Sequence, residues 1–520
     1  MSTRLAALSV ALLGMWGHPA PALAADSHSS PLHGALPRGA HAVGFTRLQL
    51  TDVTRPMTRP GEDAAASPDT RARRLDVHVW YPAAAGATGA PLTFADVMVE
   101  HLAGRPAAEL SQRETGVRSF LGEFGPVTDE AWAKLRATPL LARRDAPATT
   151  TRHPLIIGSL RALSTTITNE FLASHGFVVA MIDGEDGPEP EDSGAALEVD
   201  YRDMEFAIPA LRKRGDVHAS ALGALGFSGS GFSQLLLAMR HPDVAAVCDL
   251  ESAIFDNRML HPLSRGWGYS VTGLRVPFLH TYSVPLSKRE NRIADFEAMR
   301  YSTRYQYLVD APGIHHWDFA TEGMAASAVL GNRGANGPRL QQAFETTNRY
   351  VLQFFNAYLK KDADALAFLG RTPEANGVPA GLATVRVLPA VTPAPTIDEA
   401  LAIVATAGVA AAIERIEEAR KTDPQASLFA ESVLNQFAYR VLRRRPPAES
   451  IAIFRKIVEL FPASSNALDS LAEALEAAGD KREAVIVTGK ALEVLARQEL
   501  TMEQRRDMAV LLEARLKRLK

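Results

Sequence analysis

The stretch GALGFSGSGFSQLLLAMRHP, residues 223–242, places glycines and serines between a strand-like apolar segment and a helix-like one. A serine at such a turn is typical of a nucleophile elbow, in which a strained backbone holds the hydroxyl above a sheet. The elbow brings the backbones on its two sides together, so the residues two before and two after the serine must be small. Gly226 and Ser230 meet this requirement around Ser228. The pattern therefore indicates Ser228 as a catalytic nucleophile.

Ser230 is the alternative nucleophile in the same turn. Choosing it would place Phe232 at the crowded position two residues later, which favours Ser228. The helix after the turn directs its first amides at the site. The backbone amide of Gly229 is therefore a candidate oxyanion-hole donor.

A catalytic serine needs a base, and the base needs an orienting acid. On a sheet that carries such an elbow, the chain order is serine, acid, histidine. The segment DAPGIHHWDF, residues 310–319, follows the last predicted strand and supplies His315 and His316. At this point the sequence offers both histidines for the base.

The acid is less obvious, because the predicted strand VPFLHTYS ends at Ser283 without a carboxylate. The preceding strand, VAAVCDLES, carries Asp249 and Glu251 at its carboxyl end, where α/β sites lie. These two residues share a face of the strand, so alternation does not separate them. Glu251 is nearer the strand end, whereas an unpaired charge at Asp249 would be costly deeper in the core. We expect Glu251 to orient the histidine and Asp249 to act mainly on stability.

From residue 75 onward, apolar strand-like segments alternate with helical ones. Continuous apolar strands separated by helices predict a parallel, doubly wound α/β sheet covered by helices on both faces. The predicted strands are LDVHVWYPA, HPLIIGS, FVVAMID, ALGALGF, VAAVCDLE, VPFLHTYS and YQYLVDAP.

Read in order, LDVHVWYPA, PLIIGS, FLASHGFVVAMID, GFSGSG, CDLES and GIHHWDF resemble the α/β-hydrolases related to platelet-activating factor acetylhydrolase and the dienelactone hydrolases. The resemblance covers about residues 75–360, and its most specific parts are LASHGFVVA and the elbow. It implies an α/β-hydrolase fold and a serine hydrolase acting on small carboxylic esters, with no cofactor and no metal. The nucleophile here is serine, whereas the dienelactone hydrolases use cysteine.

The resemblance also implies roles for the acid and the base. The acetylhydrolases carry the acid in a Leu-Asp pattern, which Leu250 and Glu251 match with glutamate in place of aspartate. Their histidine lies in a G-x-x-H-x-x-F pattern, which Gly313, His316 and Phe319 match. The implied triad is therefore Ser228, Glu251 and His316.

The family's Ser-His-Gly after the third strand is replaced here by GSLR, residues 158–161. By position, the backbone amide of Leu160 is the second oxyanion-hole candidate. Arg161, His315 and Trp317 are the candidate substrate contacts, although an exposed loop arginine is an equally good interpretation of Arg161.

The C-terminal part is helical, and its apolar pattern repeats after 34 residues, so that Leu434 and Phe437 correspond to Leu468 and Leu471. This period resembles tetratricopeptide repeats, which implies a possible protein partner. The repeat departs from that family at Thr488, where an aromatic residue is usual, and at Ala496, where proline is usual.

Composition narrows the function class. The 520 residues are 47% hydrophobic and have a formal net charge of -3, which does not favour nucleic acid as a partner. A single cysteine, Cys248, excludes an internal disulfide framework. The first 24 residues have a short positive region, an apolar core too short to span a bilayer and a small-x-small site, as in a secretory signal peptide. We therefore expect a periplasmic or secreted protein without stable membrane insertion.

These signals predict a division into a signal peptide, a loose leader with one strand at AVGFTRLQLTDV, a hydrolase domain with a helical insertion, a linker and a helical-repeat domain. The predicted ranges are 1–24 for the signal peptide, 25–74 for the leader and 75–365 for the hydrolase domain, with its insertion at 90–150. The linker is predicted at 366–396 and the helical-repeat domain at 397–520. Two alternatives stay open beside the esterase: a degenerate hydrolase that binds a partner through its repeats, and a peptidase of related fold.

Overall fold

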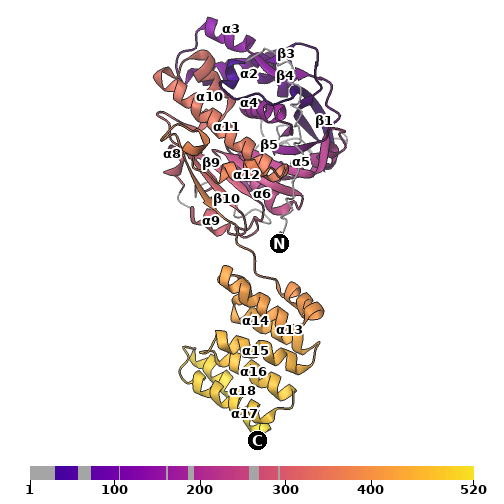
Figure 1. The fold of residues 1–520 in the computed structure, drawn as a ribbon, viewed down its shortest axis with the longest axis vertical. Coiled ribbons are helices and arrows are strands. Elements are labelled where there is room, and N and C mark those ends of the chain that lie inside the picture. Colours follow the sequence, from indigo (N-terminus) through magenta and orange to yellow (C-terminus); the bar gives the residue numbers. More distant parts are fainter. Residues whose placement is uncertain are drawn as a thin grey trace, which may run out of the picture. The chain divides into compact units, whose positions relative to one another are not determined.

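The computed structural model describes residues 30–56, 72–104, 106–159, 162–184, 193–256, 269–290 and 293–520. The predicted signal peptide lies outside these residues. The described residues before Ala390 form one compact unit, and Ala390–Lys520 form a second (Figure 1). Within the described parts of the chain, no helix is both long and apolar enough to cross a membrane.

The first unit is built on a sheet to which the described residues contribute eleven strands, in the order β11-β10-β9-β8-β7-β5-β6-β2-β1-β4-β3. The strands are β1 (Ala42–Pro56), β2 (Ala72–Ala83), β3 (Pro91–Thr93), β4 (Pro139–Arg144), β5 (His153–Ser159), β6 (Val178–Gly184), β7 (Val217–Phe227), β8 (Val244–Leu250), β9 (Phe278–Ser283), β10 (Arg304–Val309) and β11 (Ala383–Leu388).

Strand directions define the fold. The strands from β6 through β5, β7, β8 and β9 to β10 run parallel to one another, whereas β2 is antiparallel to both of its neighbours, β1 and β6. This order and this pattern of directions are those of the α/β-hydrolase fold. The predicted fold class is thus confirmed, and the carboxyl ends of the parallel strands meet at one edge, where sites of α/β proteins form.

Helices cover both faces of the sheet (Figure 1). Each face has its own apolar core. The longer helices are α2 (Ala107–Gly122), α3 (Asp129–Ala137), α4 (Ala162–Ser174), α5 (Ser193–Arg212), α6 (Ser230–Arg240) and α11 (Gly337–Leu359). The shorter ones are α1 (Phe94–Met98), α8 (Val284–Ser287), α9 (Ile293–Ala298), α10 (Thr321–Met324) and α12 (Ala363–Leu369). Side chains of α4 and α11 pack into one core, and those of α5 and α6 into the other. The β8 side chains are almost all buried, as expected for a strand covered on both faces.

The strand predicted at AVGFTRLQLTDV within the leader is present, and it spans residues 42–56. That segment is β1, which pairs antiparallel with β2 from Ala42 to Asp52. Phe45 is fully buried and its ring centroid lies 5.0 Å from that of Trp80. The pairing makes the segment a strand of the sheet, and this contact buries one of its apolar side chains in the core of the first unit.

Two other predicted segments contain strands that the sequence did not indicate. The insertion at residues 90–150 contains helices α1, α2 and α3, but also β4, which pairs in parallel with β1 and extends the sheet. The predicted linker at residues 366–396 contains β11, which pairs antiparallel with β10. Leu382 and Ala383 are buried in the core, which explains why a segment rich in proline and glycine is held in place.

The second unit is all helical and has its own core. Its helices are α13 (Ile397–Thr422), α14 (Glu431–Leu442), α15 (Pro447–Leu460), α16 (Ser465–Ala477), α17 (Lys481–Leu495) and α18 (Met502–Leu519). The starts of α14 and α16 differ by 34 residues, and so do those of α15 and α17. The buried positions Leu434 and Leu468 recur at the same interval. Gly408, with φ 87°, breaks α13.

The boundary after β11 leads to a truncation test. We expect a chain ending at Pro389 to keep a folded first unit, because β11 and its buried residues remain. A chain ending at residue 380 loses Leu382 and the pairing of β11 with β10, and its unfolding free energy should fall by roughly 3 kcal/mol or more. Chemical denaturation of the two truncated chains measures this difference. Equal stabilities would show that β11 contributes nothing to the sheet.

Candidate active site

The predicted elbow joins β7 to α6 through Ser228, whose φ is 57°. A side-chain carbon at Gly226 would lie 2.7 Å from the Cα atom of Gly231, so the backbones on the two sides touch. The Ser228 amide donates a hydrogen bond to the carbonyl of Leu250 on β8, at 3.0 Å. This strained turn holds the Ser228 hydroxyl at the carboxyl edge of the sheet.

The crowded position is one residue later than the sequence pattern indicated. Gly231, not Ser230, lies against Gly226. Ser230 is buried, and its hydroxyl accepts a hydrogen bond from the Phe227 amide at 2.9 Å and donates one to the Phe227 carbonyl at 2.8 Å. A serine is therefore accommodated at this position because its hydroxyl binds the backbone of the turn itself.

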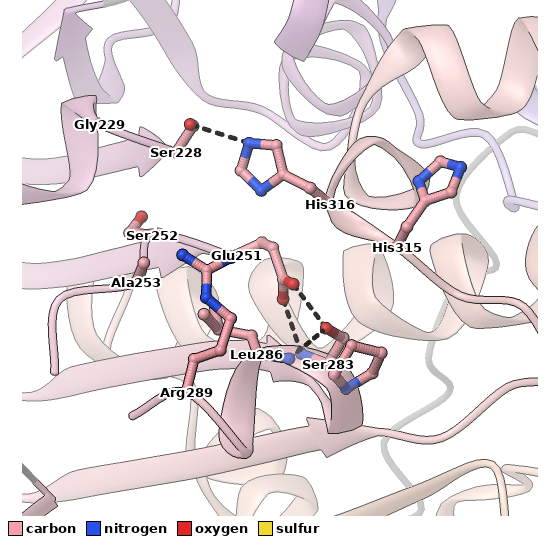
Figure 2. Close-up of a pocket in the computed structure, with 11 residues that line it drawn as sticks. Ser228, Gly229, Glu251, Ser252, Ala253, Ser283, Leu286, Arg289, His315 and His316 are labelled. Carbon is pink, nitrogen blue, oxygen red and sulfur yellow. Dashed lines mark hydrogen bonds between the residues drawn. The ribbon is translucent and has the colours of Figure 1, made fainter. Parts of the chain in front are cut away.

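His316 lies beside the elbow serine. It follows β10 and begins the short 3-10 helix η4 (His316–Phe319). Its Nε2 atom is 2.8 Å from the Oγ atom of Ser228 (Figure 2). The imidazole stacks on Phe227 with a centroid distance of 4.8 Å. Burial, followed by the nearby His315 and Arg289, lowers the pKa of His316 to about 4, so its ring is neutral at pH 7 and able to accept a proton.

Glu251 follows β8 and lines the same cavity, with φ 51°. Its carboxylate accepts hydrogen bonds from the amide of Ser283 at 2.6 Å and from the Ser283 hydroxyl at 2.5 Å. The hydrogen bonds described for these side chains thus place the carboxylate on Ser283, whereas His316 is bonded to Ser228 (Figure 2). Burial raises the pKa of Glu251 to about 7, against the effect of the Ser283 bonds.

Asp249 has a different partner, although it lies on the same strand. It is fully buried, and both of its carboxylate oxygens lie 3.0 Å from Nδ1 of His280 on β9. The Nε2 atom of His280 lies 3.1 Å from Glu290. The two carboxylates outweigh burial and raise the pKa of His280 to about 10, so this histidine is a buried cation.

Sequence reasoning missed this buried ion network. The signal was His280, a lone histidine inside the otherwise apolar strand VPFLHTYS. Its meaning depends on the register of two strands, because Asp249 pairs with His280 across β8 and β9. That register is not visible in the sequence of either strand alone.

The catalytic candidates open into a cavity of about 500 Å³. Its lining is formed by Ser228, Gly229, Glu251, Ser252, Ala253, Ser283, Pro285, Leu286, Arg289, His315 and His316. Arg289 supplies a guanidinium group, one nitrogen of which lies 3.2 Å from the carboxylate of Asp256. The cavity thus combines apolar walls with the serine, a histidine pair and one cation, and it admits a small substrate.

Of the other predicted site residues that the structure describes, two line the cavity and one does not. Gly229 is exposed at the start of α6 and lines the cavity. His315 also lines it and stacks on Phe124, with a centroid distance of 4.8 Å. Trp317 is not among the lining residues, since it packs at the edge of Phe120, at 4.7 Å.

Leu160 and Arg161, the second oxyanion-hole candidate and one candidate substrate contact, lie outside the described residues. Their proposed roles therefore remain predictions from the sequence.

Comparison with known proteins adds little to this geometry. No family model matches the chain, and no curated protein does. A solved structure that it resembles is a ferulic acid esterase from Streptomyces cinnamoneus, which is 20% identical, with 68% of this chain and 98% of that chain covered and a TM-score of 0.47. The strand order and directions, not this likeness, carry the fold assignment.

The His280 network leads to a stability test. A histidine whose pKa is raised in the folded state stabilises fully below its ordinary pKa, near 6.5, and the stabilisation is lost as pH rises through about 10. We expect His280→Gln to lower the unfolding free energy by about 3 kcal/mol at pH 7, because two buried carboxylates lose their cation. The deficit relative to the unmodified protein should shrink towards pH 10.

Chemical denaturation between pH 7 and 10 measures this effect. The matched control is His218→Gln, because His218 is exposed on β7. That change should have little effect at any pH. A deficit in His280→Gln that stays constant up to pH 10 would contradict a charged His280.

Proposed function

We propose that this protein is a serine hydrolase that cleaves small carboxylic esters through Ser228. The observation that carries the proposal is the 2.8 Å contact between Ser228 Oγ and His316 Nε2, made by a serine with φ 57° at an elbow between strand and helix. A serine hydroxyl becomes a nucleophile when a neutral imidazole accepts its proton, and this contact has the required length and partners.

The reaction follows from these positions. The Ser228 oxygen bonds to the ester carbonyl carbon while its proton passes to Nε2 of His316. The negative charge on the carbonyl oxygen is stabilised by the Gly229 amide at the start of α6, with the amide of Leu160 as the proposed second donor. His316 then gives the proton to the departing alcohol, which leaves an acyl-enzyme. A water molecule, deprotonated by the same histidine, attacks the acyl carbon and releases the acid and the serine.

Glu251 is the proposed acid of the site. In Figure 2 its side chain lies on the side of His316 opposite Ser228, so its negative charge would stabilise the imidazolium that forms during each proton transfer. Its carboxylate accepts two hydrogen bonds from Ser283, which favour the ionised form that this role requires.

The proposed substrate size rests on the cavity, and the proposed location and protein partner rest on the sequence. A volume of about 500 Å³ favours small esters over a folded polypeptide substrate. Export to the periplasm or the medium is proposed from the N-terminal sequence alone. Binding of a protein partner is proposed for the second unit on the basis of its helical repeat.

Substitution of the serine tests the nucleophile. Ser228→Ala should lower kcat/KM on a small ester by at least about 1000-fold and abolish labelling by a fluorophosphonate probe, with little change in melting temperature. The matched control is Ser230→Ala in the same turn. Because that hydroxyl binds the Phe227 backbone, its loss should cost about 1 kcal/mol of stability and keep activity within about tenfold.

An inactive but folded Ser230→Ala protein beside an active Ser228→Ala protein would overturn the assignment. Lack of both turnover and labelling in the unmodified protein would instead favour a degenerate hydrolase. Cleavage of peptides but not of esters would indicate a peptidase.

The two neighbouring carboxylates are distinguished by a second pair of variants. Glu251→Gln should lower kcat by at least about 100-fold with a small change in melting temperature, because the imidazolium loses its anion. Asp249→Asn should lower the unfolding free energy by about 3 kcal/mol and leave kcat within about tenfold, because it breaks the pair with His280. Steady-state kinetics and thermal melting of both proteins measure this. The reverse pattern would assign the acid to Asp249.

A further inference from the structure

Ser283 makes two hydrogen bonds to one carboxylate. The Ser283 amide donates to Oε2 of Glu251 at 2.6 Å, and the Ser283 hydroxyl donates to Oε1 at 2.5 Å. Ser283 is fully buried and Glu251 is 3% exposed. Such short, buried, charge-assisted hydrogen bonds are the strong ones in proteins, so the Glu251 carboxylate has one well-defined position.

The direction of the Ser283 hydroxyl is also defined. Its oxygen accepts a hydrogen bond from the amide of Leu286, at 3.2 Å, because Ser283 is the N-cap of α8. With that side of the oxygen occupied, its single proton is directed to Glu251. The start of α8 thus orients a donor at the carboxylate.

The backbone of Glu251 is also held in a defined conformation by β9. Its amide donates to the carbonyl of Thr281 on β9 at 2.8 Å, and its φ of 51° is unusual for a residue other than glycine. A backbone in this region persists only where the surroundings hold it, and it is frequent at functional sites. Both the backbone and the side chain of Glu251 are therefore held by the end of β9.

We propose that Ser283 is a positioning residue that holds the Glu251 carboxylate, ionised, beneath His316 for each catalytic proton transfer. This inference rests on the proposed function and goes beyond it, because it assigns to the end of β9 the control of the protonation of the acid. In Figure 2, Ser283 lies on the far side of Glu251 from His316, where it can hold the carboxylate without touching the substrate.

Several charged or titratable groups face Glu251 and act on its protonation. His280 on β9 favours its ionised form, and Glu290, after α8, opposes it. His315 and His316 on the η4 loop and Arg289 after α8 line the cavity into which Glu251 faces. Burial is the largest influence on the Glu251 pKa, and the two bonds from Ser283 come next and act in the opposite direction.

The direction in which loss of the Ser283 hydroxyl shifts the pH profile follows from the form of Glu251 that acts. Glu251 acts in its ionised form, so activity falls as pH drops through its pKa. Removing the Ser283 hydroxyl removes one donor to the carboxylate and raises that pKa further. The acid limb of the kcat/KM profile should therefore move to higher pH, by about one unit for the loss of one hydrogen bond to a charged group. A merely structural role for Ser283 would lower the melting temperature and leave the limb in place.

The experiment is the pH dependence of ester hydrolysis by the full chain carrying Ser283→Ala, Ser283→Cys or Ser283→Thr. The Ala and Cys variants both lack the strong hydroxyl donor, and Cys keeps nearly the same side-chain volume. If one of the two fails to fold, the other still shows where the acid limb of the kcat/KM profile lies. We expect both to shift the limb upward by about one unit and Thr, which keeps the hydroxyl, to leave it near its original pH.

Ser287→Ala is the matched control, because Ser287 is at the other end of α8 and its hydroxyl binds the carbonyl of Val284 instead of Glu251. This variant should not move the limb. An unshifted limb in a folded Ser283→Ala or Ser283→Cys protein would overturn the inference, and so would an equal shift in Ser287→Ala.

The Ser228→Ala protein, assayed in parallel, separates this inference from the proposed function. Activity that survives Ser228→Ala would reject the nucleophile, whatever Ser283 does. Activity that is lost in Ser228→Ala, together with an unshifted limb in the Ser283 variants, would reject the positioning role alone.

Discussion

The close approach of two backbone segments at the elbow is the constraint on which the rest of the site depends. No side chain fits between Gly226 and Gly231, and Ser228 is held at a φ that costs about 1–3 kcal/mol. Neighbouring contacts offset this cost: Ser230 binds the Phe227 backbone, and the Ser228 amide binds the carbonyl of Leu250. The last contact ties Ser228, the proposed nucleophile, to the residue immediately before Glu251, so the serine and the proposed acid are positioned by the same pair of strands.

The parallel sheet explains how residues far apart in the chain reach one cavity. Ser228 follows β7, Glu251 follows β8, Ser283 ends β9 and His316 follows β10. Since these four strands are consecutive neighbours and run in one direction, their carboxyl ends lie side by side at one edge. Ser228 and Glu251 directly follow their strands and Ser283 ends β9, so the strands fix these three positions. His316 lies seven residues after the end of β10, at the start of η4.

Two buried carboxylates at this edge show how environment decides the role of like residues. Asp249 lies deeper and is paired with His280, which forms a closed ion network with Glu290. Glu251, two residues further along, faces the cavity and is bonded to a neutral serine. A carboxylate whose charge is neutralised by a cation contributes to stability, whereas one that keeps an unneutralised charge beside a histidine is able to act on it. The second arrangement is the one that the proposed mechanism uses.

Local patterns in the sequence determined the strands β1, β2 and β5 to β10, the elbow at Ser228 and the 34-residue interval between helices, because each depends on residues that are close in the chain. The histidine loop was also found in this way, since it follows the last predicted parallel strand. The division of the chain was less accurate: β11 joins the sheet only because Leu382 and Ala383 find a core built by distant residues.

Only the tertiary structure decided which glycine is crowded at the elbow, which partner each carboxylate has and that Ser283 holds Glu251. These features depend on the register between β8 and β9, in which residues 31 and 32 positions apart in the chain come into hydrogen-bond contact. A register of this kind is set by the packing of the whole sheet, and neither strand carries it alone.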